Sequence, residues 1–168
     1  FVIPGYSEKS VTETDLDADN VMDDTPNGLL LWLDANEIAG QVGEPISIWN
    51  DISGNDYHMD LVDGNATLKT GPSGTMVVHY DGDDLTTTSK NFDSELRVTG
   101  YTVFGVSRYA SDDSALSGRV ITSAGRNWIF GHHGNGIRKF FFEGWIGSGQ
   151  TRDNSFHLFS ARQTPNND

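Results

Sequence analysis

Carboxylates alternate along the N-terminal stretch of the chain at Asp15, Asp17 and Asp19, and Asp23 follows four residues later. In a tight loop, side chains at alternate positions converge on one hard cation, and the backbone carbonyl of Val21 can add a further oxygen. Calcium prefers such all-oxygen ligand sets, and the ninth position contributes directly or through water. The spacing therefore predicts a Ca²⁺ site formed by these five residues.

The same run resembles the calcium-binding thrombospondin type 3 repeat, whose pattern is DxDxDGxxDxxD. Asn20 stands where the repeat has glycine, and asparagine tolerates the left-handed turn better than most other residues do. The twelfth position is Pro26, which offers no ligand side chain, so the site would need Asp24, water or a neighbouring segment. The alternative is an acidic disordered linker, because no basic residue separates these acids. Residues 1–27 are predicted to form a separate acidic arm.

A second group of residues could bind a ligand through aromatic rings and polar hydrogen-bonding groups. We select Trp128, His132, Arg138 and Trp145, because indole rings stack on sugar rings while imidazole and guanidinium groups donate hydrogen bonds to hydroxyls. The alternative is that a tryptophan on a strand belongs to the core. Zinc binding by His132 and His133 together is not expected, since neighbouring residues of a strand point to opposite faces.

Catalytic patterns are missing from the sequence. The glutamates do not form the closely spaced acid and nucleophile pair that glycoside hydrolysis requires. The chain has no cysteine, no nucleophile elbow and no phosphate-binding glycine loop. We therefore expect a protein that is not an enzyme.

Short apolar runs separated by turn residues must position these side chains, and they predict an all-β fold. Strands are expected at 29–33, 46–49, 57–61, 75–80, 100–108, 119–123, 127–131, 137–146 and 156–162. Gly71–Gly74 and His133–Gly136 are turn signals, and the Asn-Gly pair in the second is typical of a hairpin. Strand 100–108 is apolar on both faces, which favours a central position in a sheet. One helical turn is expected near 35–39 or 90–96.

Three segments together resemble LamG-like domains of the concanavalin A-type jelly-roll class. They are Leu29–Asp34, with LLLWLD; Trp49–His58, with WNDISGNDYH, which follows Ile48; and Tyr80–Leu85, with YDGDDL. The resemblance covers about residues 28–162 and implies an antiparallel β-sandwich over 28–168. It would place a second set of carboxylates at strand ends, where ordinary turn formation is favoured over calcium binding. These carboxylates are Asp34, Asp51, Asp81, Asp83 and Asp84.

LamG-like domains usually continue past the position of strand 156–162 with a terminal hairpin, and this chain offers only six more residues, 163–168. We expect the sandwich to lack that hairpin and to leave an open edge, which strand addition from another chain could fill. The chain also begins without methionine, which is typical of a processed product or of a segment of a longer protein.

Charge narrows the range of partners. The 168 residues carry a formal net charge of -13 with scattered Lys and Arg, so nucleic acid and anionic membranes are not expected partners. No apolar run is long enough to span a membrane. The sequence predicts a calcium-stabilised extracellular or cell-surface module that binds carbohydrate or a cell-surface protein without catalysis. The alternative is a structural subunit of a surface layer, filament or virion fibre, which assembles through its arm and an open sheet edge.

Overall fold

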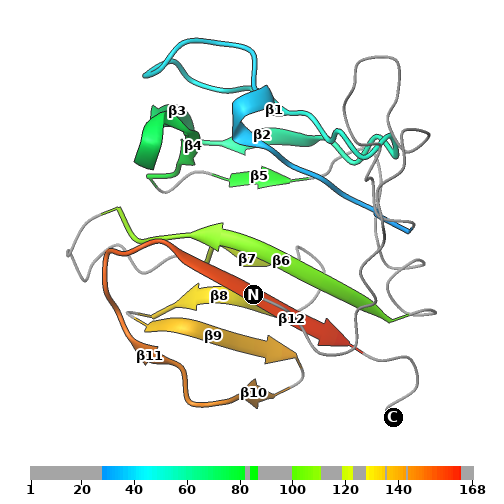
Figure 1. The fold of residues 1–168 in the computed structure, drawn as a ribbon, viewed down its shortest axis with the longest axis vertical. Helices are drawn as coiled ribbons and strands as arrows, with labels where there is room; N and C mark the ends of the chain where they lie inside the picture. The colour runs from blue at the N-terminus through cyan, green and yellow to red at the C-terminus, as the bar shows by residue number, and fades with distance from the viewer. Residues whose placement is uncertain are drawn as a thin grey trace, which may run out of the picture.

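A computed structural model shows an all-β protein built from several small antiparallel sheets (Figure 1). The structure describes residues 28–81, 84–86, 100–110, 119–122, 128–134, 136–142 and 144–163. The arm at 1–27, with the predicted calcium ligands, and the expected helical turn at 90–96 lie outside this range. Within the described part of the chain, no helix has the length and apolar character that crossing a membrane would require.

The first half of the described chain forms what we call the N-terminal group, drawn in blue to green in Figure 1. It comprises η2 (Ala35–Glu37), β1 (Ile48–Trp49), β2 (Met59–Asp63), β3 (Thr67–Thr70), η3 (Pro72–Gly74), β4 (Met76–His79) and β5 (Asp84–Thr86). One sheet has the order β1-β2-β5, and β3 pairs with β4 across the η3 turn. Ile38, Ile46, Ala66 and Leu68 form the buried centre of this group.

The second half forms the C-terminal group, which lies below the first in Figure 1. It comprises β6 (Tyr101–Ser107), β7 (Ile121–Thr122), β8 (Trp128–His133), β9 (Gly136–Phe142), β10 (Trp145–Ile146), β11 (Gln150–Thr151) and β12 (His157–Gln163). One sheet has the order β10-β9-β8-β7, with β11 also paired to β9, and β12 pairs with β6. Phe130 of β8 and Phe159 of β12 meet edge to face with ring centroids 6.3 Å apart, so the two sheets share one aromatic core.

The β8–β9 hairpin turns where the sequence predicted it, with His133 paired to Gly136. Gly134 has φ +53°, a conformation that glycine adopts without steric cost. The register then shifts, because Gly131 pairs with Lys139 while His132 pairs with Ile137. Arg138 is the extra residue of this β-bulge, and its φ is +54°. The bulge changes which residues of β9 face the core.

Several sequence predictions are confirmed, and others are wrong. The predicted segments 75–80 and 100–108 contain β4 and β6, segment 156–162 covers all of β12 except Gln163, and η2 lies within 35–39. The predicted single strand 137–146 is divided, because β9 ends at Phe142 and β10 begins at Trp145. β3, β5 and β11 were not predicted.

The predicted strand 29–33 forms only an isolated bridge between Leu33 and Asp51. Backbone groups in this segment instead bond to the side chains of Asp51, Ser53 and Asn55. These side chains take the place of a strand partner.

The expected central position of β6 is also not found among the described residues, where its neighbour in the sheet is β12. Alternate residues of β6 face the aromatic core, and the others face outward. Phe104 and Val106 are 68% and 66% exposed on the outward side. Leu158 of β12 pairs with Val106 and is 70% exposed, so the outward face carries an apolar stripe of these three side chains.

Candidate functional site

Asp51 is a buried carboxylate that joins residues 29–33 to residues 51–58. Its oxygens accept hydrogen bonds from the backbone N–H groups of Trp32, Ser53 and Tyr57 at 2.9, 2.9 and 3.0 Å. Burial alone would raise the pKa of Asp51, but these amide hydrogen bonds outweigh it and hold the pKa below its ordinary value. The carboxylate is therefore occupied in joining chain segments.

Ser53 and Asn55 complete this junction. Ser53 Oγ lies 2.8 Å from Asp51 Oδ2 and 3.0 Å from the Leu30 carbonyl oxygen, and Asn55 Nδ2 donates to the Leu29 carbonyl at 2.8 Å. Asp51 N in turn donates to His58 Nδ1 at 3.0 Å. The WNDISGNDYH segment thus holds residues 29–33 in place through side chains, which is a structural role.

Of the remaining carboxylates of the second set, Asp34 and Asp81 have described side chains. Asp34 caps η2, where its Oδ1 accepts from Asn36 N at 2.9 Å, as an ordinary turn former does. Asp81 is exposed, and the side chains of Asp83 and Asp84 lie outside the described residues. In the described ranges, no group of three or more His, Cys, Asp or Glu side chains is gathered that could hold a metal ion.

His132 lies inside the C-terminal group and has no measurable exposure. Its Nδ1 is 3.2 Å from Ser107 Oγ, and its ring meets Tyr109 and Phe159 edge to face at 4.7 and 5.1 Å. Burial, reinforced by repulsion from His157, lowers the pKa of His132 to about 4. Its Nε2 is buried without a hydrogen-bond partner. A neutral, enclosed imidazole is poorly placed to touch a ligand in solvent.

Trp128 also faces the core. It is half-buried, packs against the aromatic cluster and stacks on Phe130 with centroids 6.2 Å apart and planes 9° apart. Arg138, by contrast, is exposed at the bulge of β9. The structure therefore separates the four predicted ligand residues, with Trp128 and His132 inside and Arg138 and Trp145 outside.

Trp145 stands on the opposite face of the β7–β10 sheet, and 56% of its surface is exposed. Its ring stacks on His133, with centroids 5.8 Å apart and planes 26° apart, and meets Phe141 edge to face at 5.3 Å. Lys139 Nζ lies over the indole, 5.6 Å from its centroid. We call these four side chains, His133, Lys139, Phe141 and Trp145, the outer platform. They hold an exposed indole in a fixed orientation.

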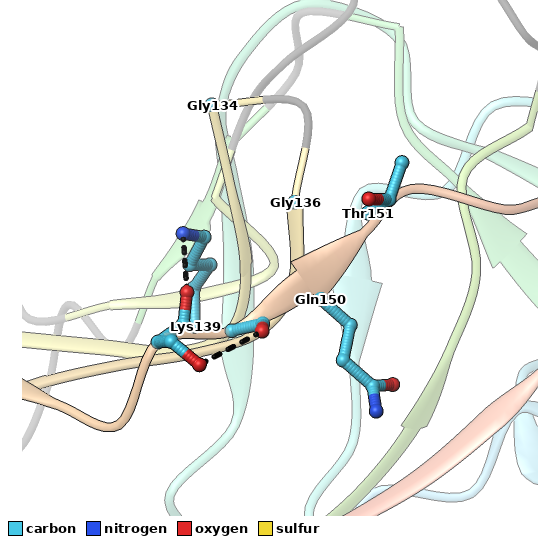
Figure 2. A pocket seen from close by; sticks show the side chains of 7 residues that line it. Gly134, Gly136, Lys139, Gln150 and Thr151 are labelled. Atoms are coloured by element: carbon cyan, nitrogen blue, oxygen red, sulfur yellow. Dashed lines mark hydrogen bonds between the residues drawn. The ribbon is translucent and has the colours of Figure 1, made fainter.

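A shallow pocket of about 330 Å³ adjoins the outer platform and shares Lys139 with it (Figure 2). Its lining consists of Gly134, Gly136, Lys139, Ser148, Gly149, Gln150 and Thr151. Lys139 Nζ donates to the Ser148 carbonyl at 3.1 Å. A Cβ atom at Gly149 would lie 2.6 Å from both Cδ and Cε of Lys139, so glycine leaves room for the lysine stem. The pocket therefore offers hydroxyl, amide and ammonium groups next to an exposed indole.

Sequence reasoning found Trp145 but missed its partners. The sequence did not identify His133 and Lys139 as neighbours of Trp145, because the positions of these two side chains depend on the bulge at Arg138. The signal that could have found the pocket is Gly144-Trp145-Ile146-Gly147-Ser148-Gly149, where three glycines surround an aromatic and a hydroxyl residue. Such spacing favours a tight polar loop beside an exposed ring.

A scan against protein-family models, a search of curated proteins and a search of solved structures found no match to this chain. The class that the described residues define is an all-β antiparallel protein with several small sheets.

Proposed function

We propose that this chain is a non-catalytic extracellular binding or adhesion module, and that it recognises carbohydrate, or a glycosylated cell-surface partner, through the outer platform. The observation that carries the proposal is the exposed, fixed indole of Trp145 beside a polar pocket. The resemblance to LamG-like jelly rolls favours the same function. The shared aromatic core of the β6–β12 and β7–β10 sheets is compatible with such a sandwich.

Carbohydrate suits this surface for a physical reason. One face of a pyranose ring presents C–H groups that pack on an aromatic ring, while its hydroxyls need hydrogen-bond partners. Trp145 supplies the flat ring, and its contacts with His133 and Phe141 limit the side-chain entropy lost on binding. Ser148, Gln150 and Thr151 supply hydroxyl and amide groups nearby.

The polar groups in the C-terminal core support a role without catalysis. Ser107 and His132 are within hydrogen-bonding distance, but His132 is enclosed by aromatic rings. Asp153, the acid that could orient a histidine, is instead 2.8 Å from His157 Nε2. His132 itself has no exposed surface on which a substrate could bind.

Calcium is the proposed cofactor, held by the acidic arm through Asp15, Asp17, Asp19, the Val21 carbonyl and Asp23. The alternating spacing of the acids supports this proposal.

A glycan array tests the binding proposal, with Trp145→Ala as the variant and Trp32→Ala as its matched control. Trp32 is also an exposed tryptophan, at 44%, but it belongs to the N-terminal group. We expect Trp145→Ala to abolish glycan binding while Trp32→Ala leaves it unchanged, with circular dichroism showing that both variants are folded. Equal binding by wild type and folded Trp145→Ala would contradict the proposed site.

The second candidate function is a structural subunit, and the outward apolar stripe of Phe104, Val106 and Leu158 favours it. The occupant would be a second copy of the chain. Arg162 is exposed on the same face of β12, where it could pair with the acidic arm of that copy. Sedimentation velocity over a hundredfold concentration range tests this candidate: self-association that Leu158→Ser abolishes supports it, and a monomer at every concentration contradicts it.

A further inference from the structure

The outer platform lies in a segment whose charge differs from that of the chain as a whole. From 128 to 151 the sequence holds two basic residues, Arg138 and Lys139, and one acidic residue, Glu143, so the segment has a formal charge of +1. The whole chain has a formal charge of -13. Glu143 lies outside the described residues. An anionic group would therefore meet less repulsion from residues 128–151 than from an average segment of this chain.

Lys139 is held where a bound group could reach it and Trp145 together. Its Nζ bonds to the Ser148 carbonyl at 3.1 Å and lies 5.6 Å from the centre of the Trp145 ring. An ammonium group has three N–H donors, and the Ser148 carbonyl accepts one of them. The remaining donors can meet a carboxylate or sulfate oxygen, while the sugar ring that carries it packs on the indole.

We propose that the ligand is an acidic saccharide, whose ring stacks on Trp145 and whose carboxylate or sulfate group pairs with Lys139 Nζ. This inference rests on the proposed function and adds the chemical class of the ligand. A compact sugar with one anionic group suits the site better than a long polyanion, because the rest of the chain would repel a nucleic acid. Arg138, exposed on the adjacent bulge, adds a second positive charge.

The experiment uses the full chain and matched pairs of oligosaccharides in isothermal titration calorimetry. One pair contrasts a glucuronic acid-containing disaccharide with its glucose counterpart, and the other contrasts a sulfated disaccharide with its unsulfated form. We expect the acidic member of at least one pair to bind roughly tenfold or more tightly, because a hydrogen bond between two charged groups is stronger than one to a neutral hydroxyl. The two pairs distinguish carboxylate from sulfate recognition.

Lys139→Met keeps the aliphatic stem over the indole and removes the charge. We expect it to bind the acidic and neutral sugars equally, whereas Lys69→Met, an exposed lysine of β3, should keep the acidic preference. Trp145→Ala should lose both sugars. Raising the salt concentration should weaken binding of the acidic sugar only.

The outcomes of these titrations distinguish a failure of the acidic-saccharide inference from a failure of the proposed carbohydrate binding. If neutral and acidic sugars bind equally to wild type and to Lys139→Met, carbohydrate binding stands and the acidic preference is overturned. If no saccharide binds, the proposed function itself fails. If an acidic peptide or a short oligonucleotide binds as tightly as the acidic sugar and depends on Lys139, the site is a general anion site, and the saccharide assignment is overturned.

Discussion

Trp145 and His133 stack across an intervening strand, because Trp145 is on β10, His133 is on β8, and β9 lies between them in the sheet. Their ring centroids are 5.8 Å apart. Both side chains stand on the same face of the sheet, and on that face a Cβ at Gly136 would collide with Lys139 of the outer platform. The result is an exposed aromatic surface that does not depend on a mobile loop for its orientation.

Substitution of Gly149 tests how strongly ligand binding at the outer platform depends on the position of Lys139. In Gly149→Ala the new Cβ would meet the Lys139 stem at 2.6 Å, so the Lys139 side chain must shift from its present position beside Trp145. Gly147→Ala is the matched control, since Gly147 has a similar positive φ, +73° against +70°, but an added Cβ there meets nothing within 4 Å. Both variants should lose about 1 kcal/mol of stability, whereas calorimetry should show weaker acidic-sugar binding for Gly149→Ala alone. Equal affinities of the two variants would contradict the positioning of Lys139.

Asp51→Asn should destabilise the protein by about 1–3 kcal/mol, because it replaces a carboxylate oxygen among backbone donors with an amide group that donates. Urea unfolding measures the change in free energy. Asp63→Asn, at an exposed residue of β2, is the control and should change stability by less than about 0.5 kcal/mol. A similar small effect at Asp51 would show that residues 29–33 do not need this junction.

Acid should destabilise the fold through His132. Its folded pKa is about 4, below the ordinary value of 6.5, so between these values the unfolded chain binds more protons than the folded chain. Stability is therefore present above pH 6.5 and falls as the pH drops toward 4, by on the order of 2 kcal/mol between pH 7 and pH 5.

Urea unfolding at several pH values measures this dependence, and His132→Gln should flatten it in that window. Asp51 acts at lower pH, since its depressed pKa gives stability that is lost as the pH falls below about 4. Should His132→Gln fail to fold, NMR titration of the His132 ring in the wild type gives its pKa directly. A value near 6.5 would contradict the burial of the imidazole.

Calcium should raise the melting temperature if the acidic arm binds it, because a ligand that binds only the folded state stabilises that state. Differential scanning calorimetry with calcium and with a chelator measures the difference. Asp17→Ala should remove most of the calcium effect, whereas Asp63→Ala should keep it. A melting temperature unchanged by chelation would contradict the cofactor assignment.

The sequence predicted much of the C-terminal group because its apolar runs alternate over long stretches. For this reason the predicted strand 100–108 contains β6, and the predicted strand 156–162 covers all of β12 except Gln163. The prediction of a strand at 29–33 was wrong. A buried apolar run has the sequence pattern of a strand even where side chains, rather than a neighbouring strand, bond to its backbone. Short strands such as β11, with two residues, carry too little pattern to be recognised.

The candidate site was predictable only in part. Aromatic type alone cannot separate Trp128, which packs in the core, from Trp145, which is exposed. The difference arises from the division of segment 137–146 into two strands and from the extra residue Arg138 in β9. Such a bulge depends on the pairing of two strands and leaves little trace in one of them.

The pairing of β6 with β12 joins residues that are far apart in the sequence, from Tyr101 opposite Gln163 to Ser107 opposite His157. During synthesis, therefore, β6 must wait for the last strand of the C-terminal group to leave the ribosome, while the β8–β9 hairpin can already form. In that interval both faces of β6 are open to water. The nascent chain would then expose the unpaired edge of β6 and the core-facing side chain of Val103, which makes chaperone contact most valuable at that stage.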